Sequence, residues 1–279
     1  MTSSTTSDKQ RALIFSIIAL ALTVLATAGR LCSLLFFYDK IGYYQRGAVL
    51  PVISNILFAA SVIFFVTAAL VWLKPAKTVA LPKKSVGYVA LLPAIALAAC
   101  AVFSVDRAIA PELNIISLLS FLLAVAGAVF FASLLFCRQP SVISVLTGVA
   151  AILWLAFSWL RSYRDFTIPM NSPDKLFFNL GCIGAALFVF SEIRAIYGMP
   201  RPRFYYFSIS TAILTLAVSS IPSLIGNACG IFASYSLTFE DIFFLALLIY
   251  AIVRLLTLVL YKPAKSDEVS ANADEEAQQ

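Results

Sequence analysis

The sequence predicts an all-α bundle of about eight membrane-spanning helices, and three observations support this prediction. First, 61% of the 279 residues are hydrophobic and only 12% are charged, whereas soluble domains average about 45–50% apolar and about 25% charged residues. Second, the apolar residues form runs of about 20 or more, which is the length that crosses a hydrocarbon core about 30 Å thick. Third, backbone amides inside lipid must be satisfied within their own segment, so such runs become helices.

The first half of the chain is expected to contain four spans, at residues 12–36, 51–73, 86–105 and 112–136. A polar cytoplasmic segment, residues 1–11, precedes the first span. Ala26-Thr27-Ala28 resembles a signal-peptidase site, but the apolar run continues beyond it, so we expect an uncleaved span. Pro51 suits the first turn of the second span, and Pro93 is expected to kink the third.

The second half is expected to contain four more spans, at residues 141–162, 174–197, 204–225 and 239–261. Ser172 followed by proline predicts a helix cap and first turn, and Thr238 with Asp241 resembles a capping box. A patch of small residues that includes Gly181 and Gly184 predicts close packing of the sixth span against a neighbour. The polar tail, 262–279, is expected to be disordered and cytoplasmic.

The pattern of the two halves predicts an internal duplication. A break near Arg138 gives a first four-span half, residues 12–137, and a second four-span half, residues 138–261. In both halves, an Asn lies near the outer end of the second span, at Asn55 and Asn179. Because each half has an even number of spans, the copies would be parallel, related by an axis along the membrane normal. The alternative is that apolar helices of similar length align by composition alone.

The charge pattern predicts both the membrane and the orientation. The net charge is +6, but the basic residues lie at span ends, which indicates contact with anionic lipid and not with nucleic acid. Twelve Lys and Arg residues outside the spans lie on the side of the termini and six on the opposite side. The positive-inside rule therefore places both termini in the cytoplasm, and we expect a protein of the plasma membrane.

The composition also excludes several kinds of chemistry. The sequence contains no histidine, which excludes Ser-His-Asp triads and zinc sites of the HExxH type. No Gly is followed by Lys, so there is no Walker A loop, and the five cysteines form no CxxC pair. We therefore expect no cofactor and no metal site, and the absence of a catalytic constellation argues against an enzyme.

Charged residues inside the spans are the first candidates for function, because a charge at the centre of a span costs about 2.5–3.5 kcal/mol. Arg254 is expected about 10 Å and Glu192 about 8 Å from the same membrane face. Their similar depth permits a Glu192–Arg254 pair, and the alternative is that both side chains snorkel to the cytoplasmic headgroups. For Arg30, near the outer end of the first span, we expect snorkelling.

A second group of candidates lies near the outer face. Arg161 and Asp165 are four residues apart and can pair on one face of a helix. An outward-open polar cavity between the halves would be lined by Asp39, Asn55, Arg161, Arg164, Asp165 and Asn179. The alternative is an ordinary solvated rim.

Two functions are compatible with this organisation. The first is a permease-like protein or transporter subunit that handles a small solute or lipid at the interface of the halves. The second is a membrane sensor or scaffold that binds a protein partner through its basic cytoplasmic loops. The polar residues at span ends favour the first, and the basic connectors favour the second.

Overall fold

The computed structural model describes residues 3–39, 43–73, 84–108, 115–136, 141–164, 172–199, 201–231 and 239–260. Its helices are α1 (Ser3–Phe37), α2 (Val49–Thr67) continued by the π-helical turn η1 (Ala68–Trp72), α3 (Lys84–Ala108), α4 (Ile115–Phe136), α5 (Val142–Arg164), α6 (Pro173–Ile196), α7 (Pro202–Ala228) and α8 (Phe239–Leu260). Eight segments of this described part are long and apolar enough to cross a membrane. The predicted fold class is therefore confirmed, and the helices are those of a multi-pass membrane protein. Asp165, Thr238 and the tail from residue 262 lie outside the described residues.

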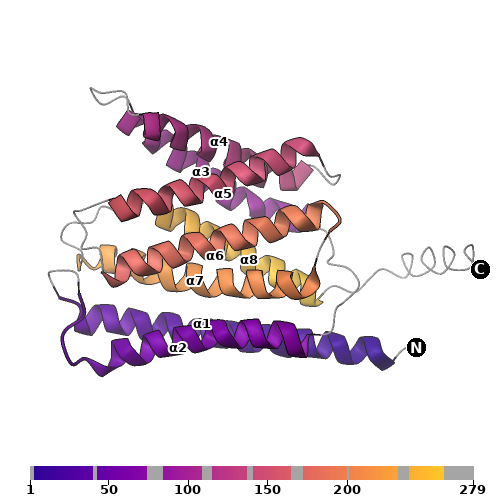
Figure 1. Ribbon diagram of the computed structural model, residues 1–279, viewed down its shortest axis with the longest axis horizontal. Coiled ribbons are helices and arrows are strands. Elements are labelled where there is room, and N and C mark those ends of the chain that lie inside the picture. The colour runs from indigo at the N-terminus through magenta and orange to yellow at the C-terminus, as the bar shows by residue number, and fades with distance from the viewer. Residues whose placement is uncertain are drawn as a thin grey trace, which may run out of the picture.

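Successive helices run in opposite directions, so the bundle has two ends (Figure 1). We call the end where α1 finishes and α6 begins the outer end, and the opposite one the inner end, following the orientation that the charge count predicts. The helix α1 begins at Ser3, well before the expected start of the first span at residue 12. Residues such as Lys9 and Arg11 have good helix propensity and extend it toward the inner side.

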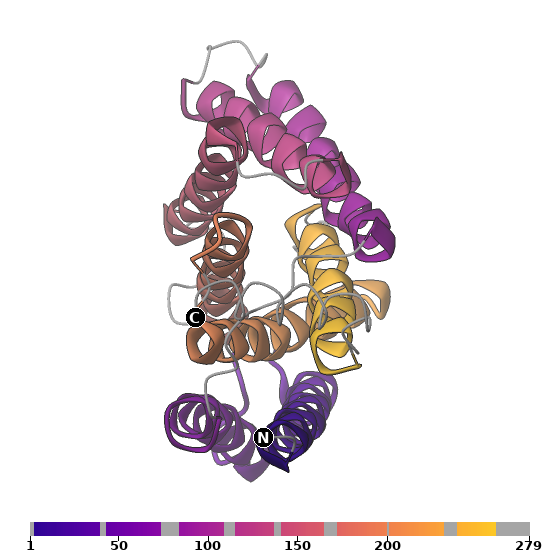
Figure 2. The same cartoon turned by 90° about the vertical axis from the view of Figure 1, so that its right-hand side faces the viewer.

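Six helices, α3 to α8, form a closed ring, which Figure 2 shows end-on. Each of them packs on the next along the chain, and α8 packs back on α3. The interior of this α3–α8 ring is filled by buried side chains. Five aromatic rings with centroids 5.2–6.4 Å apart form a continuous aromatic plug across it: Phe131, Trp154, Phe188, Phe243 and Tyr250.

The hairpin of α1 and α2 lies outside the ring and packs mainly on α7 (Figure 1). A second apolar core fills this contact and includes Phe15, Phe65, Phe177 and Val218. The hairpin of α3 and α4 lies on the opposite side of the molecule, in the ring itself. The hairpins α1–α2 and α5–α6 have different surroundings in the bundle. The proposed duplication and the division of the chain at residue 138 stay predictions.

The helix α7 is the most buried span and contacts α1, α2, α6 and α8. Its approach to α6 depends on two glycines, as the patch of small residues predicted. A Cβ atom on Gly184 would overlap the Thr215 hydroxyl, and one on Gly181 would lie 3.2 Å from the Ser219 side chain. No larger residue fits this contact without movement, so α6 has a fixed position against α7.

The ends of α6 and α7 follow local sequence rules. The Ser172 hydroxyl accepts a hydrogen bond from the amide of Lys175 at 3.3 Å, and Pro173 occupies the first turn, which confirms the predicted cap. Gly198 (φ 70°) and Gly230 (φ 66°) each lie two residues beyond the end of these helices. Glycine adopts this left-handed conformation without strain, so it terminates each helix and turns the chain.

Candidate functional site

A fully buried ion pair connects α6 and α8 near the inner end of the bundle. Arg254 Nε donates to Glu192 Oε1 at 3.1 Å, and the side chains of the two residues are 0% and 1% exposed. The Tyr205 hydroxyl, from the beginning of α7, donates to the same carboxylate oxygen. The Arg254 guanidinium carbon also lies 5.5 Å from the centre of the Tyr205 ring. We call Glu192, Tyr205 and Arg254 the inner charge cluster.

The structure thus forms the Glu192–Arg254 pair that the depth of the two residues permitted, and neither side chain snorkels. The second carboxylate oxygen, Glu192 Oε2, has no hydrogen-bond partner among the described residues. A buried ion pair returns about as much free energy as its desolvation costs, so replacing it with apolar side chains is often neutral. Stability alone therefore does not explain why these charges are buried.

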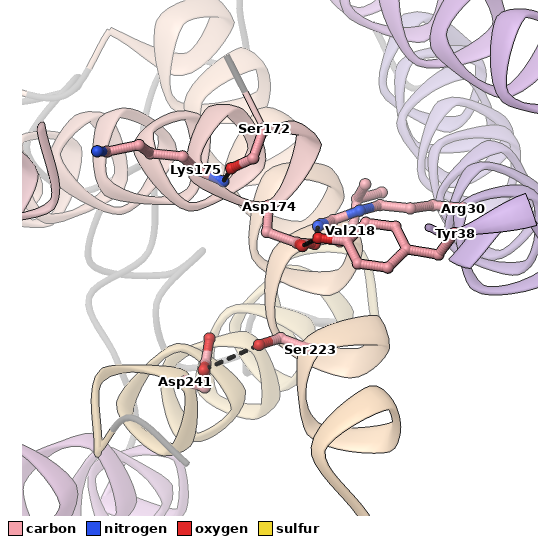
Figure 3. A network of polar contacts seen from close by, with 8 residues as sticks. All are labelled: Arg30, Tyr38, Ser172, Asp174, Lys175, Val218, Ser223 and Asp241. Carbon is pink, nitrogen blue, oxygen red and sulfur yellow. Dashed lines mark hydrogen bonds and ion pairs between the residues drawn. The ribbon is translucent and has the colours of Figure 1, made fainter. Parts of the chain in front are cut away.

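A second set of charges lies near the outer end, where α1 meets α6 (Figure 3). Arg30 Nη2 donates to Asp174 Oδ1 at 2.8 Å, and Arg30 Nη1 donates to the backbone carbonyl of Val218 in α7. The Tyr38 hydroxyl donates to the other oxygen of Asp174. The guanidinium carbon lies 4.1 Å from the centre of the Phe177 ring. We call Arg30, Tyr38 and Asp174 the outer charge cluster.

The expectation that Arg30 snorkels was wrong, because the residue is only 1% exposed. Its partner, Asp174, gave only a weak signal in the sequence, since an acidic residue in the first turn of a helix is ordinarily explained by the helix dipole. Tyr38 pairs with Tyr44 in an isolated antiparallel bridge beyond the end of α1. Partial burial raises the pKa of the Tyr44 phenol above its ordinary value, so this neighbour of Arg30 remains neutral.

A third group of residues joins α5 and α8 across the interior of the ring. Arg161 forms an ion pair with Glu240, and the Trp154 ring meets the Phe243 ring edge-to-face at 5.2 Å. Ser158 lies between Trp154 and Arg161 on the same face of α5, at spacings of four and three residues. We call Trp154, Ser158, Arg161, Glu240 and Phe243 the α5–α8 cluster.

Comparison with known proteins adds nothing to this geometry. No family model, no curated protein and no solved structure matches the chain. Within the described residues, no three His, Cys, Asp or Glu side chains are grouped so that they could hold a metal ion.

The residues expected to line one outer cavity are not gathered in one place. Asp39 and Asn55 are exposed and belong to the α1–α2 hairpin, whereas Arg161 is in α5 on the far side of α7. Arg164 is exposed at the end of α5. Asn179 is half-buried in α6, and its Oδ1 has no partner in the described part of the chain. Arg161 reaches Glu240, a partner that the sequence did not suggest because the two residues are on helices that are not adjacent in the chain.

Proposed function

We propose that this protein is a permease-like membrane protein that moves a small solute through the α3–α8 ring. The inner charge cluster is the observation that supports this function most strongly. Ionisable side chains inside membrane spans are rare and usually mark a pathway for ions or solutes. An ion pair between α6 and α8 holds two members of the ring together, and its separation would open the inner end.

The order of groups along the ring also supports transport. The Arg161–Glu240 pair lies toward the outer end, and Trp154 and Phe243 of the same cluster belong to the aromatic plug that follows it. The inner charge cluster lies beyond the plug. Alternating access is a rocking or gating motion of one helix group against another around a fixed site, and a polar entrance, an apolar barrier and a breakable polar contact are compatible with it. The solute would enter at the α5–α8 cluster and leave after the plug and the inner cluster have separated.

Accessibility of Cys182 to a water-soluble reagent tests the proposal. Cys182 is in α6, is 3% exposed and is close enough to Arg161 for the two to interact electrostatically. In a variant with Cys182 as its sole cysteine, a charged methanethiosulfonate reagent applied to the outer side of sealed vesicles should modify the thiol as the ring opens. A variant that retains only Cys229, which is exposed beyond the end of α7, gives the reference rate. If Cys229 reacts and Cys182 remains unmodified, the ring is a packed core and the transport proposal fails.

The scaffold function makes the opposite prediction for Cys182. In that case the spans only pack, and a protein partner would bind basic residues at the inner end. Arg201 is exposed there, before the first turn of α7. A protein complex that is lost when Arg194, Arg201 and Arg203 are neutralised, together with an unreactive Cys182, would favour the scaffold.

A further inference from the structure

The α5–α8 cluster consists of two contacts between the same two helices, one aromatic and one charged, which we call its floor and its roof. Its floor is the edge-to-face contact of Trp154 with Phe243, and its roof is the Arg161–Glu240 ion pair. Floor and roof are seven residues apart on α5, or about 10 Å along the helix axis. Both connect the same two helices, and Ser158 lies between them on the same face of α5.

Two buried polar groups in this space have no partner among the described residues. Trp154 is 1% exposed and Ser158 is 2% exposed, and neither the Trp154 Nε1–H nor the Ser158 hydroxyl has a hydrogen-bond partner in the described part of the chain. A hydroxyl rotates to find an acceptor, but an indole N–H has one fixed direction. Because an unpaired buried donor is costly, the Trp154 N–H indicates that an acceptor from outside the chain binds here.

The charges at the roof restrict the kind of ligand. Arg161 offers a cation, and Glu240 offers a carboxylate opposite it. A ligand with a single charge would satisfy one of these side chains and leave the other without its partner, which is unfavourable in a partly buried site. A ligand with both charges replaces one ion pair with two and adds no net charge.

We propose that the α5–α8 cluster binds a small zwitterion that carries one ammonium and one carboxylate group. The ligand carboxylate accepts from Arg161 and from the Trp154 N–H, and its ammonium donates to Glu240. The hydroxyl of Ser158 supplies a further polar contact between them. This inference rests on the proposed function, because it names the class of solute that enters the ring.

Binding to the purified protein in lipid nanodiscs tests the inference directly. The probes are radiolabelled glycine and β-alanine as zwitterions, with methylamine and acetate as single-charge controls. Glycine or β-alanine should bind and raise the melting temperature, and methylamine and acetate should do neither. Trp154→Phe retains the aromatic contact with Phe243 but removes the N–H donor, and it should weaken zwitterion binding about tenfold.

Trp159→Phe is the matched control, because Trp159 belongs to the same helix and is 42% exposed on the surface of the bundle. This variant should bind the zwitterions like the unmodified protein. Equal losses in both variants, or an unchanged affinity in Trp154→Phe, would overturn the site. Equal binding of acetate or methylamine would overturn the ligand class, and so would the failure of both zwitterions to bind.

The Cys182 reaction separates failure of this inference from failure of the transport function. If the reagent modifies Cys182 but no zwitterion binds, the pathway stands and the ligand class is wrong. If a zwitterion binds and slows the modification of Cys182, the site and the pathway are the same. If Cys182 is unreactive and no zwitterion binds, both proposals fail.

Discussion

The two charge clusters contain the same chemistry at opposite ends of one helix. Each consists of an arginine, a carboxylate and a tyrosine, and each carboxylate is on α6, at Asp174 and Glu192. Their separation of 18 positions places the carboxylates about 27 Å apart along the helix axis. Each cluster fastens α6 to a different helix, α1 at the outer end and α8 at the inner end.

The clusters differ in how many of their carboxylate oxygens accept hydrogen bonds. In the outer cluster both oxygens of Asp174 accept hydrogen bonds, and the guanidinium also contacts a carbonyl and the Phe177 ring. In the inner cluster the hydrogen bonds from Tyr205 and Arg254 both go to Glu192 Oε1. The comparison indicates that the outer cluster is a structural clamp in which both oxygens of Asp174 are engaged, whereas Glu192 Oε2 has no hydrogen bond among the described residues. Five single substitutions probe the two clusters and the helix contact between them, beginning with the largest expected effect.

Arg254→Met should be the most destabilising change. It leaves the Glu192 carboxylate buried without its cation, and the loss of one partner from a buried pair costs about 3–5 kcal/mol. The measurement is the free energy of unfolding in mixed micelles. The double variant Glu192→Gln with Arg254→Met should recover most of this loss, because no uncompensated charge remains. A double variant that is less stable than Arg254→Met would show that the pair itself stabilises the fold.

Asp174→Asn should cost less, about 1.5–3 kcal/mol, which is the range for a hydrogen bond to a charged group. Arg30 retains the Val218 carbonyl and the Phe177 ring, and the Asp174 side chain is 16% exposed, so water replaces part of the interaction. Proteolysis between α1 and α2 should become faster, because the clamp holds this hairpin. If Asp174→Asn destabilises the protein as much as Arg254→Met, the distinction between the two clusters is lost.

Gly184→Ala tests the contact that holds α6 against α7 between the two clusters. The added methyl group overlaps the Thr215 hydroxyl, and overpacking of this kind typically costs about 1–3 kcal/mol. Adding Thr215→Ala should restore the melting temperature, since it removes the overlapping oxygen. A single variant with an unchanged melting temperature would show that α6 moves freely against α7.

The two tyrosines should give the smallest effects. Tyr205→Phe and Tyr38→Phe each remove one hydroxyl donor from a carboxylate, with a loss of about 0.5–1.5 kcal/mol. The loss should be greater for Tyr205, because its cluster is sealed from solvent, whereas water can reach part of Asp174. Thermal unfolding of both variants side by side gives the comparison, and a larger loss for Tyr38 would contradict it.

The sequence predicted the helices well because long apolar runs have one outcome in lipid. It also permitted the Glu192–Arg254 pair, since two opposite charges at equal depth in apolar runs need partners. It did not reveal the Arg30–Asp174 pair, because Asp174 occupies a position where acidic residues are common for another reason. The closed ring was also not predictable, because lipid and protein contacts select similar apolar side chains and the pattern does not name the neighbouring helix.

The separation of Arg30 from Asp174 along the chain has a consequence for biosynthesis. The two residues are 144 positions apart, and ribosomes add about 5–20 residues per second. The first span therefore enters the bilayer on the order of ten seconds before its carboxylate partner exists. During this interval the Arg30 side chain has to reach the headgroups, as an isolated arginine near a span end does. The snorkelling geometry that the finished protein lacks is thus the expected state of the nascent chain, and synthesis of α6 ends it.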